Sequence, residues 1–181
     1  TLEHLGDVDD ALHVYINYTD VALSSQYRKL LEGRYRALTQ LVMQRQFQTL
    51  LANEQALGAE RFSPKAVAVF PLLYQGSDPK YEALGKGLSE MILIDLGQVK
   101  SLTVVERIRV EALLDELKFG QSDKVDKATA PRLGKLLSAG RVVGGSFNVY
   151  RYNVRMDVAA WDITSKKNPT INTGSDELDN L

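Results

Sequence analysis

The chain has 181 residues, of which 44% are hydrophobic and 25% charged, a composition typical of a soluble globular protein with one sizeable core. Its 22 Lys and Arg against 23 Asp and Glu leave a net charge of -1, so no excess of positive charge favours binding to nucleic acid or to a membrane surface. Cysteine is absent, which excludes disulfides, thiolate metal sites and a cysteine nucleophile. No apolar run approaches the ~20 residues that cross a bilayer.

Residues that usually carry catalysis are scarce. His4 and His13 are the two histidines, and their spacing does not present two imidazoles to a metal on one helix face. Gly85 to Ser89 lacks the spacing of a phosphate loop and falls in a helical pattern, where close packing of a helix on a sheet explains its glycines. Gly144 to Asn148 lacks the second glycine of a nucleophile elbow and is typical of a strand interior. We therefore expect no catalytic residue, no cofactor and no metal site, and an enzyme is the least favoured class of protein.

The first 62 residues predict an all-α segment. From Leu2 to Leu57 there is no proline, and glycine occurs only at Gly6 and Gly33, so the pattern predicts helix throughout. The second half of this segment carries apolar residues near the i, i+3, i+4, i+7 spacing of an amphipathic helix. These residues are Tyr27, Leu30, Leu31, Tyr35, Leu38, Leu41, Val42 and Leu50.

The apolar stripe must be covered, and its spacing leaves three covers open. The first is a neighbouring helix or the following domain, the second a partner protein, and the third helical repeats that precede Thr1 in a longer chain. Tyr35, Leu38 and Val42 are the candidate interaction residues here, and self-association of the chain through these helices is a further possibility.

Residues 63–181 predict a mixed α/β domain. Ala66 to Phe70 is an apolar, β-branched run typical of a central strand buried on both faces. Further strands and helices follow with clear boundaries. The expected elements are a helix over 84–96 that ends at Gly97, a strand over 102–105, a helix around 110–117 that ends at Gly120, a helix over 132–139 that ends at Gly140 with Pro131 in its first turn, a strand over 142–149 and a strand over 154–158.

The last part of the chain predicts antiparallel pairing. About four residues from Tyr150 to Asn153 join the two preceding strands, and so short a connection indicates a hairpin. A turn over 162–169 then leads to one more antiparallel strand, which begins with residues 170–173. The fold class is therefore α/β (α+β), a mixed sheet in the order β-α-β-α-α-β-β-β with helices packed on it, preceded by the all-α amphipathic segment.

Two resemblances add to this description. Leu5-Gly6-Asp7 with Ala11, Tyr15 and Tyr18 resembles the second helix of a tetratricopeptide unit. Over 64–181 the chain resembles the CsgG-like, or curli assembly, domain, whose relatives include the amino-terminal domain of TolB and the lipoprotein activators of penicillin-binding proteins. The residues that carry this second resemblance are Val67 to Leu72, Leu84 to Met91 with Leu96, Leu102 to Arg107, Leu113 to Leu117, Leu133 to Gly140 and Val142 to Ser146.

The resemblance implies a non-enzymatic protein-binding and assembly module of the bacterial cell envelope. Such a module faces the periplasm, binds other envelope proteins, and is held at the outer membrane by a lipid anchor outside this sequence. Gly174 to Asp179 resembles the point where the family enters a terminal helix, so the domain is expected to lack that helix. Pore-forming members carry a long membrane hairpin at the connection that matches 150–153, and this short connection does not predict a channel.

Two sets of residues are therefore candidates for protein interaction. Tyr150, Arg151, Tyr152 and Arg155 place two aromatic rings and two guanidinium groups around one hairpin tip, and these are the residue types that binding hot spots favour. Ordinary exposed hairpin residues are the alternative. The alternative function is a cytoplasmic sensory domain of a bacterial regulator that combines this fold with tetratricopeptide repeats. A lipidated cysteine upstream of Thr1 would favour the envelope function.

Overall fold

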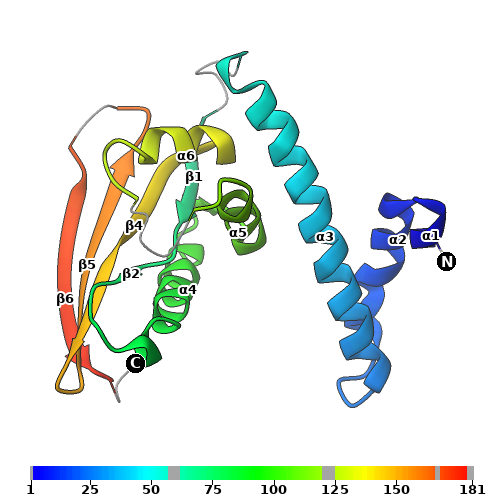
Figure 1. Ribbon diagram of the computed structural model, residues 1–181, viewed down its shortest axis with the longest axis horizontal. Helices are drawn as coiled ribbons and strands as arrows, with labels where there is room; N and C mark the ends of the chain where they lie inside the picture. The colour runs from blue at the N-terminus through cyan, green and yellow to red at the C-terminus, as the bar shows by residue number, and fades with distance from the viewer. Residues whose placement is uncertain (1, 57–61, 120–124, 166–167, 179–181) are drawn as a thin grey trace.

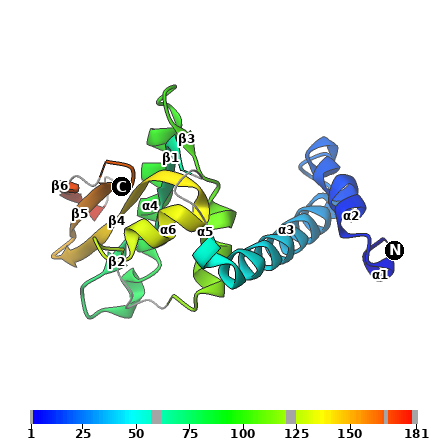
Figure 2. The ribbon, with the colours of Figure 1, turned by 90° about the horizontal axis from the view of Figure 1, so that it is seen from above.

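The structure, a computed structural model, describes residues 2–56, 62–119, 125–165 and 168–178. A mixed sheet with helices against it forms the body of the molecule, and a long helix, α3 (Gln26–Ala52), runs from this body to a small group of N-terminal helices (Figures 1 and 2). The expected fold class, a mixed sheet with packed helices after a helical segment, is confirmed. Within the described residues, no helix is both long and apolar enough to span a membrane.

The N-terminal segment is helical with two interruptions, so the prediction of unbroken helix from Leu2 to Leu57 was wrong in this respect. The first follows α1 (Leu2–Leu5), where Gly6 adopts a φ of 84°. The second follows α2 (Val8–Tyr15) and the 3-10 helix η1 (Ile16–Asp20), after which the Ser25 side chain accepts a hydrogen bond from the Tyr27 N–H and caps α3. Leu57 lies outside the described residues.

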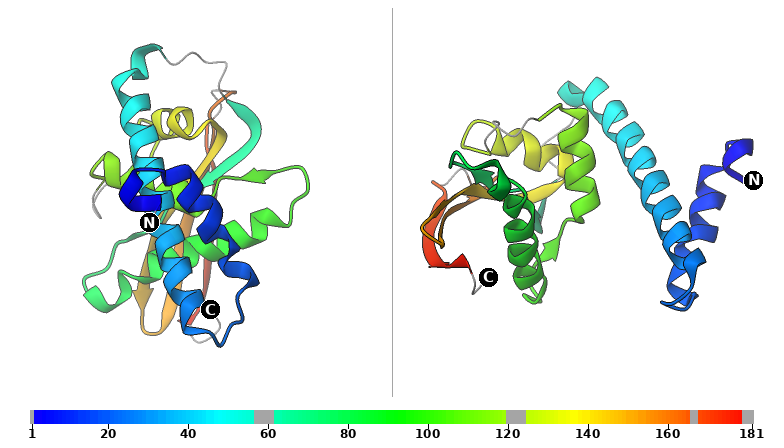
Figure 3. Two further views of the ribbon diagram at one scale, coloured as in Figure 1. Left: turned by 90° about the vertical axis from the view of Figure 1, so that its right-hand side faces the viewer. Right: turned by 60° about the horizontal axis from the view of Figure 1, so that its bottom comes forward.

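One side chain holds the chain reversal between η1 and α3 in place. The Arg28 guanidinium donates hydrogen bonds to the carbonyl oxygens of Thr19, at 3.0 Å, and of Val21. Thr19 lies in the last turn of η1 and Val21 directly follows it, where carbonyl oxygens receive no N–H from within the helix. The reversal lays η1 and α2 against α3 (Figure 3).

The C-terminal half of α3 belongs to the core of the α/β body. Phe47 is 1% exposed and lies in the same apolar cluster as Leu113 and Leu133 of the neighbouring helices. The Gln40 amide also donates to the Asp115 carboxylate at 3.1 Å. The division of the chain into two parts at residue 62 stays a prediction. In the structure, α3 contacts both the N-terminal helices and the α/β body.

An ion pair fastens the end of α3 to the body. Arg132 donates from Nε and Nη2 to the two carboxylate oxygens of Glu54, at 2.8 and 2.9 Å. The hydrogen bonds from Arg132 hold the pKa of Glu54 below its usual value. The bidentate geometry fixes the orientation of the short η2 turn (Glu54–Ala56) that follows α3.

The body is built around one sheet with the strand order β3-β1-β4-β5-β6, in which β2 also pairs with β4. Its elements, in chain order, are β1 (Ser63–Val69), β2 (Leu73–Tyr74), η4 (Pro79–Tyr81), α4 (Leu84–Gly97), β3 (Thr103–Val104), α5 (Arg107–Glu116), α6 (Ala130–Leu137), β4 (Ala139–Tyr150), β5 (Asn153–Asp162) and β6 (Thr170–Glu177). The strands around β1 are parallel, and β4, β5 and β6 are antiparallel. β2 was not predicted, because two residues are too few for a strand period.

Helices cover both faces of the parallel part of the sheet. Val67 and Val69 of β1 lie in a cluster with Leu93 of α4, whereas Ala66 and Ala68 lie in the cluster that includes α5 and α6. Each fully buried apolar side chain of this kind stabilises the fold by roughly 1.5–3 kcal/mol. The continuous apolar run of β1 therefore follows from burial on both sides.

Several predicted ends of elements require correction. α6 ends at Leu137 rather than Ala139, because Ser138 adopts a left-handed φ of 56° and Ala139 and Gly140 begin β4. A Cβ on Gly140 would lie 2.6 Å from the Ser63 carbonyl oxygen, so this glycine permits close approach of β1 and β4 and does not end a helix. α5 ends at Glu116, and Gly120 lies outside the described residues. Pro131 lies in the first turn of α6, as predicted.

The C-terminal segment is also different from the prediction. Residues 174–177, which resemble the point where the family enters a terminal helix, continue β6 as a strand, and Asp179 lies outside the described residues. The whole of β6 is polar except for Ile171, and all of its residues are exposed. Apolar and polar residues do not alternate along β6. The sequence therefore indicated where this strand begins but not how far it extends.

The position of Phe47 leads to a test of the role of α3. Replacement of Phe47 by Ala is expected to lower the free energy of unfolding by about 3–5 kcal/mol, because the change leaves a cavity in the main core. Leu30 lies on the same helix but is 59% exposed, and Leu30→Ala is expected to change the free energy by less than about 0.5 kcal/mol. Urea denaturation measures both. Equal, small effects would contradict the assignment of the second half of α3 to the core.

Candidate interaction surfaces

The turn between β4 and β5 is a tight two-residue connection. Tyr150 pairs with Asn153, so only Arg151 and Tyr152 form the turn, fewer than the four connecting residues predicted. Both turn residues have positive φ, at 46° and 67°. These angles are those of a type I′ turn, which favours Asn-Gly because bulky residues are strained in the left-handed region.

The tip of this hairpin gathers all four residues predicted there. Tyr150 and Tyr152 are 68% and 73% exposed. The Arg151 guanidinium lies 5.2 Å from the centre of the Tyr150 ring, a cation–π arrangement. Arg155 lies in β5, two residues after Asn153, and its guanidinium is 3.7 Å from the Asp157 carboxylate. The tip therefore exposes two phenol rings and two cations on a short, braced turn.

Backbone contacts hold the tip against the neighbouring strand. The Leu178 N–H donates to the Tyr152 carbonyl oxygen at 2.6 Å, and the Asn153 side-chain amide donates to the Arg151 carbonyl oxygen at 3.3 Å. A surface whose backbone is already ordered loses less entropy when a partner binds. The rigid presentation of exposed Tyr and Arg side chains supports an interaction role for this tip.

The second predicted set lies on α3 and faces the protein's own N-terminal helices. Leu38 is 9% exposed, and the Tyr35 ring packs against the Tyr18 ring at a centre-to-centre distance of 5.8 Å. Intramolecular packing on η1 and α2 therefore accounts for Tyr35 and Leu38, one of the covers that the spacing left open. An interaction role for them remains a prediction. The helix α3 that carries them lies on the opposite side of the molecule from the β4–β5 hairpin (Figure 1).

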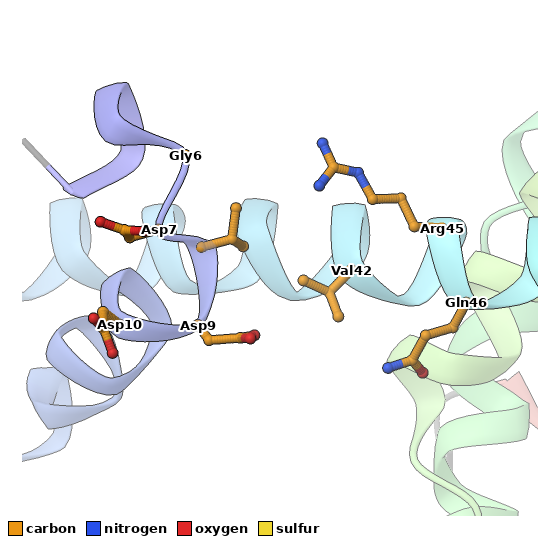
Figure 4. Close-up of a pocket in the computed structure, with 8 residues that line it drawn as sticks. Gly6, Asp7, Asp9, Asp10, Val42, Arg45 and Gln46 are labelled. Atoms are coloured by element: carbon orange, nitrogen blue, oxygen red, sulfur yellow. The ribbon is translucent and has the colours of Figure 1, made fainter.

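Val42, the last residue of that set, is half-buried in an open groove. The groove has a volume of about 540 Å³ and lies between the start of α2 and α3. Asp7, Asp9 and Asp10 line its α2 side, and Arg45 lines the α3 side (Figure 4). Charged and polar residues line both sides of the groove, together with the apolar Val8 and Val42.

The sequence pattern did not show which apolar residues of α3 are exposed and which are buried. Tyr27 and Leu30 are 62% and 59% exposed, although they belong to the same predicted stripe as Leu38. The stripe is broad enough to wrap around more than one face, so its N-terminal part stays in solvent while its C-terminal part enters the core. Which apolar side chains of α3 are exposed depends on the position of α2, and the spacing of residues along α3 does not specify that position.

Glycines singled out in the sequence have structural roles. A Cβ on Gly85 would lie 2.2 Å from the Leu72 carbonyl oxygen and 3.2 Å from the Phe147 ring, so close packing of α4 on the sheet explains this glycine. Gly144 and Ser146 lie inside β4, as predicted. Among the described residues there is no group of three or more His, Asp or Glu side chains placed to hold a metal ion.

A family comparison matches the chain over residues 40–159, about two-thirds of its length, to the model described as curli production assembly/transport component CsgG. The chain therefore belongs to the CsgG family, as the sequence resemblance indicated. The match begins within α3, at the part of that helix that enters the core. A search of curated protein sequences gave no significant match.

Three solved structures are similar to this chain at low sequence identity. The NMR structure of E. coli LpoB has a TM-score of 0.50 and 12% identity, over 61% of this chain and 55% of LpoB. The LpoB C-terminal domain from Salmonella enterica has a TM-score of 0.48 and 12% identity, over 75% of this chain and 95% of that domain. Lipoprotein GNA1162 from Neisseria meningitidis has a TM-score of 0.45 and 16% identity, over 63% of this chain and 81% of that one.

The strain at the tip can be measured through stability. Tyr152→Gly is expected to raise the free energy of unfolding by about 1 kcal/mol, because glycine adopts the φ of 67° without the steric cost of a Cβ. Tyr150 is the last residue of β4, directly before the turn, and has no positive φ. Tyr150→Gly is therefore expected to lower the free energy of unfolding by about 1 kcal/mol. Urea denaturation of both variants tests the assignment, and a loss of stability in Tyr152→Gly would refute it.

Proposed function

We propose that the chain is a non-enzymatic protein-binding and assembly module of a bacterial cell-envelope protein. It faces the periplasm, and a lipid anchor outside this sequence holds it at the outer membrane. Membership of the CsgG family and the fold shared with LpoB support this proposal. Within this framework the chain binds other envelope proteins in secretion, envelope assembly or regulation of wall synthesis.

The observation that carries the proposal is the hairpin tip. Two bulky residues, Arg151 and Tyr152, occupy positions where Asn-Gly would form the turn without strain. Strained backbone that persists at an exposed site is a reason to look for function there. Exposed Tyr and Arg side chains are common among residues that dominate binding energy.

The chemistry of the tip defines the kind of partner. Arg151 and Arg155 offer two guanidinium groups, each able to bind a carboxylate through two hydrogen bonds. Tyr150 and Tyr152 offer flat apolar rings with a hydroxyl at the end. We infer a partner protein that places carboxylates beside apolar side chains.

The same connection argues against a channel formed by this hairpin. A membrane-spanning β-strand needs ~9–11 residues in each direction beyond the folded body. Here the turn consists of Arg151 and Tyr152, and β4 and β5 are paired with other strands of the sheet along their lengths. The protein is therefore proposed to bind through the tip and not to insert it into a membrane.

A photo-crosslinking amino acid in place of Tyr152 tests the proposal in the native host, in the full-length gene product. We expect a discrete crosslinked species with an envelope protein, since the side chain at this position is 73% exposed at the proposed contact. The matched control places the crosslinker at the exposed Lys100, next to the start of β3, where no species is expected. The double substitution Arg151→Ala and Arg155→Ala is expected to abolish the species.

Fractionation and palmitate labelling of the same cells test the location. A labelled protein in the outer-membrane fraction is the expected result. An unlabelled cytoplasmic protein would contradict the envelope proposal, and equal crosslinking from Tyr152 and Lys100 would contradict the role of the tip. Melting curves of the purified variants establish that each remains folded.

A further inference from the structure

The outermost strand, β6, leaves one long edge of the sheet open. All eight of its residues are exposed, and among the described residues no helix or strand lies on its outer side (Figure 1). The opposite edge is β3, which has two residues. Long open edges present unpaired backbone groups and are sites at which another strand adds to a sheet.

The register shows which backbone groups of β6 point outward. Leu178 donates its N–H to Tyr152, so this opposed pair is hydrogen-bonded, and hydrogen-bonded pairs alternate along an antiparallel ladder. Asn172, Gly174 and Asp176 therefore direct their N–H and C=O groups toward β5. The residues between them direct these groups away from β5: Ile171, Thr173, Ser175 and Glu177. The Glu177 N–H donates to the Asp176 carboxylate at 2.7 Å.

The hairpin turn gives the same result independently. In a two-residue turn the flanking pair, Tyr150 and Asn153, is hydrogen-bonded, so odd-numbered residues of β5 bond to β4. Even-numbered residues of β5 then bond to β6, where each faces an even-numbered residue. The odd-numbered residues of β6 are thus the ones whose backbone groups β5 does not use.

We propose that this edge pairs with the same edge of a second copy of the chain, in antiparallel orientation, with Gly174 opposite Gly174 at the two-fold axis. Outward-facing residues must oppose outward-facing residues in such a pair, which limits the possible registers. In the proposed register Ile171 faces Glu177 and Thr173 faces Ser175. Thr173 and Ser175 then exchange both of their backbone hydrogen bonds, and the Ile171 N–H donates to the Glu177 carbonyl oxygen, while the Glu177 N–H bonds to Asp176 within its own chain.

The side chains of β6 suit a copy of the same strand. Thr173 opposite Ser175 forms a hydroxyl pair, one of the cross-strand pairs that stabilise sheets, and the two-fold axis creates it twice. Asp176 faces Asn172 and Glu177 faces Ile171, so no two carboxylates are opposed. A net charge of -1 on each chain adds no strong repulsion between copies.

Gly174 fits the axis of this pairing. Its backbone groups point toward β5, so the two copies of Gly174 form a non-hydrogen-bonded pair, in which opposed Cα atoms are about 4.5 Å apart. A Cβ at Gly174 would meet no atom within 4 Å in the single chain, so a larger residue is sterically tolerated there. This pairing is independent of the proposed function of the tip and of the N-terminal helices.

A single cysteine tests the axis, because the chain contains no cysteine. Gly174→Cys is expected to form a disulfide-linked dimer under mild oxidation, since a disulfide spans Cα atoms about 4.4–6.8 Å apart. Asn172→Cys is the matched control. Its two copies would lie about 13 Å apart along the strands in the proposed register and are expected to remain unlinked. Equal linking of both variants, or none of Gly174→Cys, would overturn the proposal.

A second pair of variants tests the backbone contact without a covalent bond. Ser175→Pro removes an outward N–H that β5 does not use, and proline is tolerated in edge strands. Light scattering over a concentration series is expected to show a dimer for the parent chain and for Ser175→Ala, and a folded monomer for Ser175→Pro. A parent chain that stays monomeric would overturn self-pairing and leave the edge to an extended segment of another protein. A dimer that survives in Ser175→Pro would overturn it as well.

Discussion

The two-residue turn between β4 and β5 is the constraint on which the antiparallel half of the structure depends. A turn this short fixes the register of the hairpin, and a shift of one residue would exchange the faces of every side chain on both strands. With Tyr150 opposite Asn153, Phe147 and Val154 lie on the buried side against Leu88 of α4. The register of β6 follows from that of β5, because the two strands are paired along the whole of β6.

Three properties of the molecule follow from this one register. The apolar side of the hairpin meets α4 and completes the core. The turn itself places Tyr152 and its neighbours in solvent, where strain and exposure coincide. The backbone of β6 directs alternate groups out of the sheet, which leaves an edge that is open to another strand. The proposed partner surface and the proposed pairing edge are thus two consequences of the same hydrogen-bonding pattern.

The second organising feature is α3, which joins two environments. Its C-terminal half contributes Phe47 to the core and is tied to α6 through Glu54 and Arg132. Its N-terminal half carries α2 and η1 away from the sheet (Figure 2). The family match that starts at residue 40 agrees with this division within a single helix, at a point where no break in secondary structure occurs.

Much of the body was predictable because local signals agreed with one another. The apolar run of β1, the glycine at position 85 and the brevity of the β4–β5 connection each have a direct physical meaning, and each was interpreted correctly. β2 and the second half of β6 were missed, since a two-residue strand has no period and a fully exposed strand has no apolar alternation. The end of α6 was misplaced because a serine, Ser138, adopts the left-handed conformation that a glycine usually provides.

The candidate site was predictable only in part. The residues of the tip are neighbours in the sequence, so their grouping was evident, but the strain in their backbone was not. Tyr35, Leu38 and Tyr27 shared one pattern, yet the first two are covered by the chain's own N-terminal helices and the third is exposed. That distinction depends on the reversal at Arg28, which helical spacing does not encode.

Amide hydrogen exchange of β6, followed residue by residue by NMR in dilute solution, tests the register most directly. Slow exchange is expected at Asn172, Gly174 and Asp176, whose N–H groups bond to β5, and fast exchange at Thr173 and Ser175. Rising protein concentration should then slow exchange at Ile171, Thr173 and Ser175, whose N–H groups the second copy covers. Uniform exchange along β6, or the opposite alternation, would contradict the register and the surfaces derived from it.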